Sequence, residues 1–371
     1  MDTKAYSTWL EIDSGAIKDN VKAIQTLTGT QVMAVIKANG YGHGVLAAAR
    51  AATSAGAQWC GVARMEEALN LRSAGIKSQI MVLGYTPPAL IQDAIRNDIH
   101  VAIYDPKLAG DYVAHAKQVG GGLKAHVKVE TGMGRLGMAP GDVPDFLVDF
   151  CNNGVIEVDG IFTHLARADE PDADLTDQQL GKFNTLLLQL QKANLCPPVI
   201  HSANSAAVLN FPAAHYDLVR PGIAIFGIDP SPGSHLPESF RPALTWKARL
   251  TSVRTLSPGH GVSYGSIYVT SRHERIGIIP VGYGDGYRRV SGQEVIVRGK
   301  RVKVVGRVCM DQCMVQLDDV PEAVVGDEVV LLGQQGGERI TAEDLAAKWG
   351  TISYEVVCGL ADRLPRLIKE S

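Results

Sequence analysis

The feature that most constrains this chain is an alternation between short apolar runs and longer segments of helical period. It extends from Gln31 to about Gly227. Such alternation is typical of βα units, in which helices join parallel strands. The candidate strands are Val32–Ile36, Trp59–Val62, Ile80–Leu83, His100–Ile103, Lys124–Val129, Val158–Thr163, Val199–His201 and Leu218–Arg220. Eight such units predict an α/β fold with a closed (β/α)8 barrel of the TIM type.

The rest of the chain has a different sequence pattern. After the Pro- and Gly-rich stretch Asp229–Pro242, closely spaced strands alternate with turns, which indicates a mainly antiparallel β domain. We assign the early strand Thr8–Ile12 to that domain and expect one short helix near Ala342–Lys348. The predicted organisation is therefore a barrel over 13–240 and a β domain over 1–12 and 241–371.

Composition excludes several classes of function. A net charge of −3 lacks the basic excess of nucleic-acid-binding proteins, so no nucleic-acid partner is expected. No apolar run reaches the roughly 18 residues that cross a bilayer, and no signal-type segment follows the start, so we expect a cytoplasmic protein without membrane contact. The six cysteines contain no Cys-x-x-Cys pair, and neither a metal site nor a disulfide framework is expected.

The chemistry of a (β/α)8 barrel lies at the carboxyl ends of its strands. Lys37 ends the first strand and precedes a glycine-rich turn over 38–44 that contains Tyr41. A nucleotide-binding P-loop carries its lysine at the far end of the loop, so this turn is of another kind. A partly buried lysine at a barrel mouth is suited to a Schiff base, because burial lowers its pKa. A surface lysine at a loop start is the alternative.

The stretch over 35–44, VIKANGYGHG, closely resembles the pyridoxal-phosphate attachment motif of the alanine racemase family, which has fold type III. The resemblance continues in the same order at 133–137, 201–205, 220–223, 261–265 and 310–311. It implies an enzyme that interconverts L- and D-alanine by a two-base mechanism and provides D-alanine for peptidoglycan. It also implies pyridoxal 5′-phosphate bound to Lys37 as an aldimine. The second base would be Tyr264, supplied across the interface of a homodimer with shared active sites.

The resemblance assigns further residues to the cofactor. Those at the phosphate group would be Tyr41, Ser205, Gly222, Ile223 and Tyr354, and Leu83 and Asn204 would also contact the cofactor. Arg220 would contact the pyridine nitrogen, with His164 supporting it through a hydrogen bond. Because an arginine keeps its proton, the ring would stay neutral, which limits side reactions. A structural ion pair between Arg220 and Asp217 is the alternative.

Other residues are implied at the substrate. Arg135 and the backbone amide of Met310 would recognise the carboxylate, whereas Tyr283, Tyr354 and Asp169 would shape the entry. Lys128 lies seven residues before Arg135, where two like charges would repel. In several relatives the equivalent lysine is carbamylated, and we expect the same modification of Lys128.

Three alternatives to an alanine racemase stay open. The first is a racemase of broader or different specificity, for example for serine or lysine. The second is a fold type III decarboxylase with the same cofactor, although such enzymes place a carboxylate at the pyridine nitrogen, where this chain has Arg220. The third is a non-catalytic pyridoxal-phosphate-binding protein, which generally lacks a second domain.

Overall fold

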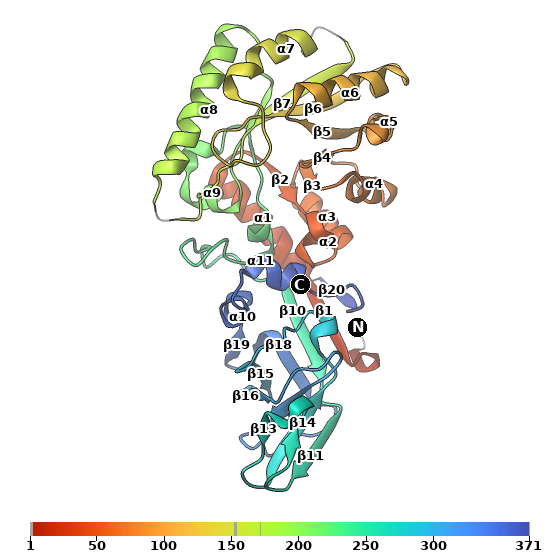
Figure 1. Cartoon of the computed structure of the whole chain (residues 1–371), viewed down its shortest axis with the longest axis vertical. Coiled ribbons are helices and arrows are strands. Elements are labelled where there is room, and N and C mark those ends of the chain that lie inside the picture. The colour runs from red at the N-terminus through yellow and green to blue at the C-terminus, as the bar shows by residue number, and fades with distance from the viewer. Residues whose placement is uncertain (1–2, 152–153, 171, 371) are drawn as a thin grey trace. The chain divides into compact units, whose positions relative to one another are not determined.

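The computed structural model describes residues 3–151, 154–170 and 172–370. The chain forms two compact units (Figure 1). The barrel unit comprises 17–41 and 45–241, and the β unit comprises 1–16, 42–44 and 242–371.

Eight parallel strands form the barrel unit. They are β2 (Gln31–Val35), β3 (Trp59–Val62), β4 (Gln79–Val82), β5 (Ile99–Ile103), β6 (Leu123–Lys128), β7 (Ile156–Phe162), β8 (Val199–His201) and β9 (Leu218–Val219). They pair in the order β8-β7-β6-β5-β4-β3-β2-β9. The two edges meet through backbone hydrogen bonds from Asp217 to Ile200 at 3.1 Å and from Arg220 to Ala203 at 2.8 Å. The expectation of an eight-stranded barrel is confirmed, with a nearly closed sheet.

Helices connect these strands. They are α1 (Ser14–Thr28), α2 (Lys37–Tyr41), α3 (Val45–Ser54), α4 (Met65–Ser73), α5 (Ile91–Arg96), α6 (Pro106–Lys117), α7 (Val143–Cys151), α8 (Asp174–Lys192) and α9 (Ser205–Asn210). Local chemistry fixes their starts, because the Asp105 carboxylate caps α6 by accepting from the Leu108 amide, and Pro106 opens its first turn. In α8, apolar side chains recur at helical spacing and are buried, as Leu180, Phe183 and Leu187 show. No helix of the described residues has the length and apolarity to span a membrane.

The β unit is built on a long sheet. Its strands are β1 (Thr8–Asp13), β10 (Leu244–Arg249), β11 (Ser252–Leu256), β14 (Glu274–Ile279), β15 (Glu294–Val297), β16 (Lys300–Val305), β17 (Cys313–Gln316), β18 (Glu328–Gln335), β19 (Glu338–Ile340) and β20 (Arg366–Lys369). A separate pair consists of β12 (Gly261–Val262) and β13 (Tyr268–Val269). The N-terminal strand joins this sheet as expected, but β1 pairs in parallel with β20 and antiparallel with β10.

Two helices follow β19 in the β unit. Helix α10 (Ala342–Trp349) matches the expected short helix and begins at a capping box formed by Thr341 and Asp344. Helix α11 (Ser353–Cys358) was not predicted, because six residues are too few to display a helical period.

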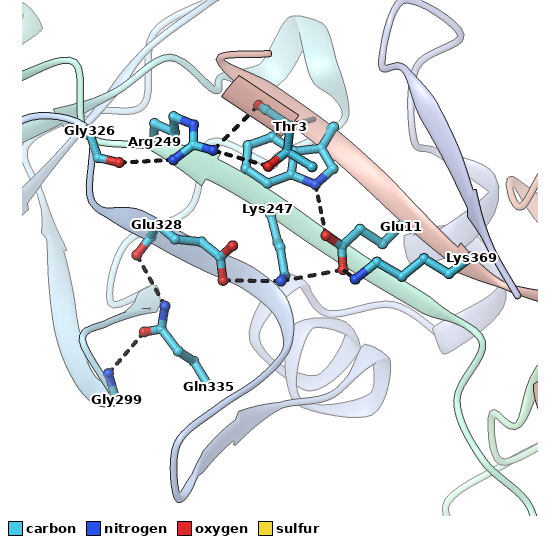
Figure 2. Close-up of polar contacts among 10 residues, drawn as sticks. Thr3, Glu11, Lys247, Arg249, Gly299, Gly326, Glu328, Gln335 and Lys369 are labelled. Carbon is cyan, nitrogen blue, oxygen red and sulfur yellow. Dashed lines mark hydrogen bonds and ion pairs between the residues drawn. The ribbon is translucent and has the colours of Figure 1, made fainter. Parts of the chain in front are cut away.

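A charged network ties the two chain ends to the sheet of the β unit (Figure 2). Glu11 on β1 is buried and accepts from Trp9, and it forms ion pairs with Lys369 on β20 and Lys247 on β10. Lys247 also pairs with Glu328 on β18 at 3.1 Å. Four strands that lie far apart in sequence are thus joined around one carboxylate.

This network predicts a pH-dependent contribution to stability. Burial alone would raise the pKa of Glu11, but hydrogen bonds from Lys369 and Trp9 and the charge of Lys247 lower it below the usual 4.5. A lowered pKa means that the folded chain favours the carboxylate, so this stability is present above pH 4.5 and is lost as the pH falls further.

We therefore expect Glu11→Gln to lower the free energy of unfolding at pH 7 by about 1.5–3 kcal/mol, the value of hydrogen bonds to a charged group. The deficit should shrink as the pH drops below 4.5. Denaturant titrations across this range measure it, with Glu322→Gln, an exposed carboxylate of the same unit, as control. A deficit that does not change with pH would contradict the assignment.

Candidate active site

Lys37 begins a strained turn directly after β2. The next residues have positive φ angles, with 52° at Ala38, 54° at Asn39 and 50° at Tyr41, so the chain forms a left-handed turn. This conformation costs roughly 1–2 kcal/mol for each residue other than glycine. Hydrogen bonds hold the turn: the Ala38 amide donates to Glu67 at 2.7 Å, the Gly40 amide donates to the Ile36 carbonyl at 2.9 Å, and the Asn39 side chain accepts from the Val45 amide at 2.9 Å. The strained backbone therefore fixes the position of the Lys37 main chain, from which the side chain extends.

Hydroxyl and amide groups converge at the ends of β8 and β9. The Ser205 hydroxyl accepts from the amides of Gly222 at 2.9 Å and Ala224 at 3.3 Å. A Cβ atom on Gly222 would lie 2.4 Å from the Tyr41 hydroxyl, so only glycine leaves room for that tyrosine. Tyr41, Ser205 and Gly222, which lie far apart in sequence, are therefore neighbours, and we call them the hydroxyl cradle.

The remaining residues implied near this cradle occupy defined positions. Asn204 caps α9 by accepting from the Ala207 amide at 3.0 Å. Ile223 is buried at the start of the 3-10 helix Ile223–Phe226. Leu83 directly follows β4 and is half-buried. Asn204 therefore has a structural task whether or not it also contacts a ligand.

The Arg220 guanidinium is buried at 4% exposure and is surrounded by neutral acceptors. Its terminal nitrogens lie 2.9 Å from the Thr163 carbonyl and 3.0 Å from the Ser202 carbonyl. Nδ1 of His201 lies at 2.8 Å and Nδ1 of His164 at 3.3 Å. The Nε–H group of Arg220 has no acceptor among the described residues and is free to bind a ligand.

This geometry bears on two expectations about Arg220. The Asp217 carboxylate accepts from the Ile200 amide at 2.8 Å, and no carboxylate of the described residues acts on Arg220, so the structural ion pair is excluded. His164 does contact Arg220, but His201 makes the shorter hydrogen bond. From the sequence, His201 was included only in the motif at 201–205 and had no predicted role, because its contact with Arg220 depends on closure of the barrel.

Positive charge is concentrated at this end of the barrel. Burial, together with Arg220, Arg135, Lys128 and Lys37, lowers the pKa of His164 well below its usual value. Burial also lowers the pKa of Lys128 to about 8, and the charges of Arg135 and Arg220 add to that effect. Burial lowers the pKa of Arg220 to about 9, which leaves it protonated at neutral pH. Four cations acting on one another define a site for anionic groups.

Arg135 lies in a loop whose backbone amides bind the carboxylate of Glu130. Glu130 accepts from four successive backbone amides, those of residues 132–135. Burial alone would raise the pKa of Glu130, but these amides outweigh it and lower the pKa. The role of Glu130 could not be predicted from the sequence, because its hydrogen-bond partners are backbone amides, which give no signal in residue type.

The other implied residues, apart from Asp169, lie in the β unit. Tyr264 opens the 3-10 helix Tyr264–Ser266 and is 68% exposed. Tyr283 and Met310 are 46% and 54% exposed, and backbone hydrogen bonds from Tyr283 to Cys309 and from Gly284 to Met310 make them neighbours. Tyr354 lies on α11. Asp169 belongs to the barrel unit, where its carbonyl accepts from Ser231.

Comparisons with known proteins identify the family. The model described as "Alanine racemase, N-terminal domain" matches residues 12–230, and that described as "Alanine racemase, C-terminal domain" matches residues 243–368. The chain belongs to the alanine racemase family.

Members of this family match along nearly the whole chain. An alanine racemase of Symbiobacterium thermophilum is 46% identical and covers 97% of this chain and 96% of its own length. One from Desulfovibrio desulfuricans is 42% identical, with 98% of both chains covered. The crystal structure of alanine racemase from D-cycloserine-producing Streptomyces lavendulae has a TM-score of 0.93 at 40% identity and covers 98% of this chain and 97% of that one.

For this alanine racemase family member, the Glu130 contacts predict a local effect. Replacing Glu130 by Ala removes charged hydrogen bonds of about 1.5–3 kcal/mol each, so amide exchange at 132–135 should accelerate at least tenfold. Hydrogen–deuterium exchange with mass spectrometry measures it, and strands β6 and β7 serve as internal reference. Asp142→Ala, an exposed carboxylate of the same unit, should leave these amides unchanged. Unaltered exchange in the Glu130 variant would refute this role.

Proposed function

We propose that this chain is an alanine racemase that uses pyridoxal 5′-phosphate. The observation that carries the proposal is the group of cations Lys37, Lys128, Arg135 and Arg220 on a barrel that also contains the hydroxyl cradle. The proposal is supported by the full-length similarity to curated alanine racemases.

The barrel residues fit this cofactor on their own chemistry. Hydroxyl and amide groups at Tyr41, Ser205 and Gly222 suit a phosphate. The unpaired Nε–H of Arg220 suits a pyridine nitrogen, which accepts a hydrogen bond without taking the proton. Leu83, Asn204, Ile223, His164 and Tyr354 complete the proposed cofactor contacts.

Racemisation requires proton transfer on both faces of the substrate α-carbon. Pyridoxal phosphate, when bound, withdraws electrons from that carbon and makes its proton acidic. Lys37 Nζ would move the proton on one face, and the Tyr264 hydroxyl would move it on the other. Arg135 and the Met310 amide would hold the carboxylate, and Tyr283 would restrict the entry.

We further propose a homodimer in which each active site receives Tyr264 and Met310 from the partner subunit. The support is an exposed apolar surface on the β unit, where Tyr264, Ile267, Val269 and Met310 are each more than half exposed. Monomers rarely expose such groups together, so a second copy of the chain would cover them.

Specificity within the family is a separate question. Histidine racemase from Leuconostoc mesenteroides subsp. sake has a TM-score of 0.90 at 31% identity and covers 98% of both chains. The same fold therefore accepts another amino acid, which keeps a racemase of broader or different specificity as the second candidate, with serine and lysine as test substrates. A decarboxylase is less well supported, because Arg220 is not a proton donor to the ring. In the cell, D-alanine made in the cytoplasm would enter peptidoglycan.

The two proposed bases give the central test. Lys37→Ala and Tyr264→Phe should each lower kcat for alanine racemisation by about 10²–10⁴-fold, the usual contribution of an acid–base group. In D2O, the Tyr264 variant should still exchange the α-proton of one enantiomer without inverting it, because Lys37 remains. Chiral chromatography and NMR measure both quantities. Wild-type rates in either variant, or an inactive wild type, would refute the proposal.

The same variants test the shared site. When the two inactive chains are mixed, one of the two active sites in each mixed dimer combines an intact Lys37 with an intact Tyr264, so activity should reappear. The control is each variant mixed with itself. If the mixture gains nothing although mixed dimers form, Tyr264 does not come from the partner subunit.

Carbamylation of Lys128 is also proposed. The Lys128 amine would attack carbon dioxide to form a carbamate and release a proton, which replaces one of the four cations by an anion and leaves Lys37, Arg135 and Arg220 positive. The reaction needs the neutral amine, and burial, with the charges of Arg135 and Arg220, lowers the pKa of Lys128 to about 8.

With 13C-bicarbonate at pH 8, we expect one carbamate signal per chain in the NMR spectrum. It should disappear in Lys128→Gln and persist in Lys124→Gln, a lysine of the same strand that pairs with Asp98 at 2.8 Å. An unmodified amine at full occupancy in electron density would rule the modification out.

A further inference from the structure

A pair of histidines lies behind Arg220 in the barrel interior. His201 on β8 and His126 on β6 are fully buried, and Nε2 of His201 lies 2.8 Å from Nδ1 of His126. The other ring nitrogen of His201, Nδ1, lies 2.8 Å from Arg220. Three side chains thus form one line of hydrogen bonds from the candidate site into the barrel.

The direction of these hydrogen bonds follows from Arg220. A guanidinium has donors only, so Nδ1 of His201 must accept. Burial, reinforced by Arg220, lowers the pKa of His201 well below its usual value, so the ring is neutral and carries one proton. That proton must be on Nε2, which therefore donates to Nδ1 of His126.

Among the described residues, the His126 ring forms one hydrogen bond, in which its Nδ1 accepts from Nε2 of His201. Burial, together with His100 and Arg220, lowers its pKa well below the usual value, so this ring is also neutral. Its proton is then on Nε2, which has no hydrogen-bond partner among the described residues. Around it, the rings of Trp59 and His100 pack edge to face at 5.3 and 5.5 Å.

The barrel is locally irregular at His126. The pairing of β6 with β7 shifts register there, from Ala125 opposite Val158 to His126 opposite Gly160. A Cβ atom on Gly160 would lie 2.3 Å from Nδ1 of His126, far inside van der Waals contact. A bulge and a glycine together make the space that the imidazole occupies.

We propose that His126 is a positioning residue that fixes the tautomer of His201 and, through it, the orientation of Arg220. Without an acceptor at position 126, the Nε2–H of His201 would be buried without a partner. The other tautomer would direct an Nδ1–H at the donors of Arg220. Either outcome displaces the guanidinium. The expected effect on catalysis rests on the proposed function, which assigns Arg220 to the cofactor ring. The tautomer of His201 is independent of that proposal.

Two variants of similar shape test the catalytic effect. In His126→Asn the side-chain oxygen can replace Nδ1 as acceptor, whereas His126→Leu has no acceptor. We expect kcat for alanine racemisation to fall at least tenfold in the leucine variant and less than threefold in the asparagine variant. KM should change less than threefold in both, because the described hydrogen bond of His126 goes to His201 and Arg135, the proposed carboxylate ligand, is not among the charges that act on it. Equal losses in both variants, or no loss in leucine, would overturn the proposal.

The tautomer is measured directly by NMR on the full-length protein as purified, with 15N-labelled histidine and signals assigned by single substitutions. We expect His201 to carry its proton on Nε2 in the wild type and in His126→Asn, and to lose this pattern in His126→Leu. A wild-type His201 protonated on Nδ1 overturns the proposal even if the leucine variant fails to fold. An inactive wild type with the expected tautomer would refute the proposed function and leave the role of His126 toward His201 intact.

Discussion

The candidate site depends on a guanidinium that is buried without a counter-charge among the described residues. Desolvating an ion costs several kcal/mol, and Arg220 recovers part of that through hydrogen bonds to Thr163, Ser202, His164 and His201. All of these acceptors are neutral, so they satisfy its donors without cancelling its charge. Burial, reinforced by that remaining charge, lowers the pKa of both His164 and His201 and keeps them unprotonated.

The other cations add to this imbalance. Lys37, Lys128 and Arg135 act on the same part of the barrel, and like charges in a partly buried site repel. The barrel is therefore less stable empty than it would be with neutral side chains at these positions. An anionic ligand relieves the repulsion, and its binding free energy then also stabilises the fold. The repulsion among these cations thus links ligand binding to folding.

Sequence reasoning located what depends on local pattern. The apolar runs identified eight barrel strands to within two residues, and the position of Lys37 after the first of them indicated the reacting end. It missed Glu67, Glu130 and the function of His201. Glu67 and His201 act on groups that the fold brings near, such as the Ala38 amide, so no spacing in the sequence indicates them. Glu130 accepts from nearby backbone amides, which give no signal in residue type. Function and family were predicted through motif resemblance, whereas the supporting contacts required coordinates.

Irregular backbone features occur in both units of the chain. The barrel unit contains the left-handed turn at 38–41, the bulge opposite His126 and the buried Arg220. In the β unit, Ser263 and Ser266 on either side of Tyr264 have positive φ angles of 65° and 44°, and the pairing of β10 with β18 shifts register between Trp246 and Lys247. Departures from local rules cost stability and persist where the surrounding fold enforces them. Apart from the shift at Trp246, these features lie near Lys37 and at His126 and Arg220 in the barrel unit, and near Tyr264 in the β unit, which are residues of the proposed function and of the hydrogen-bond line behind it.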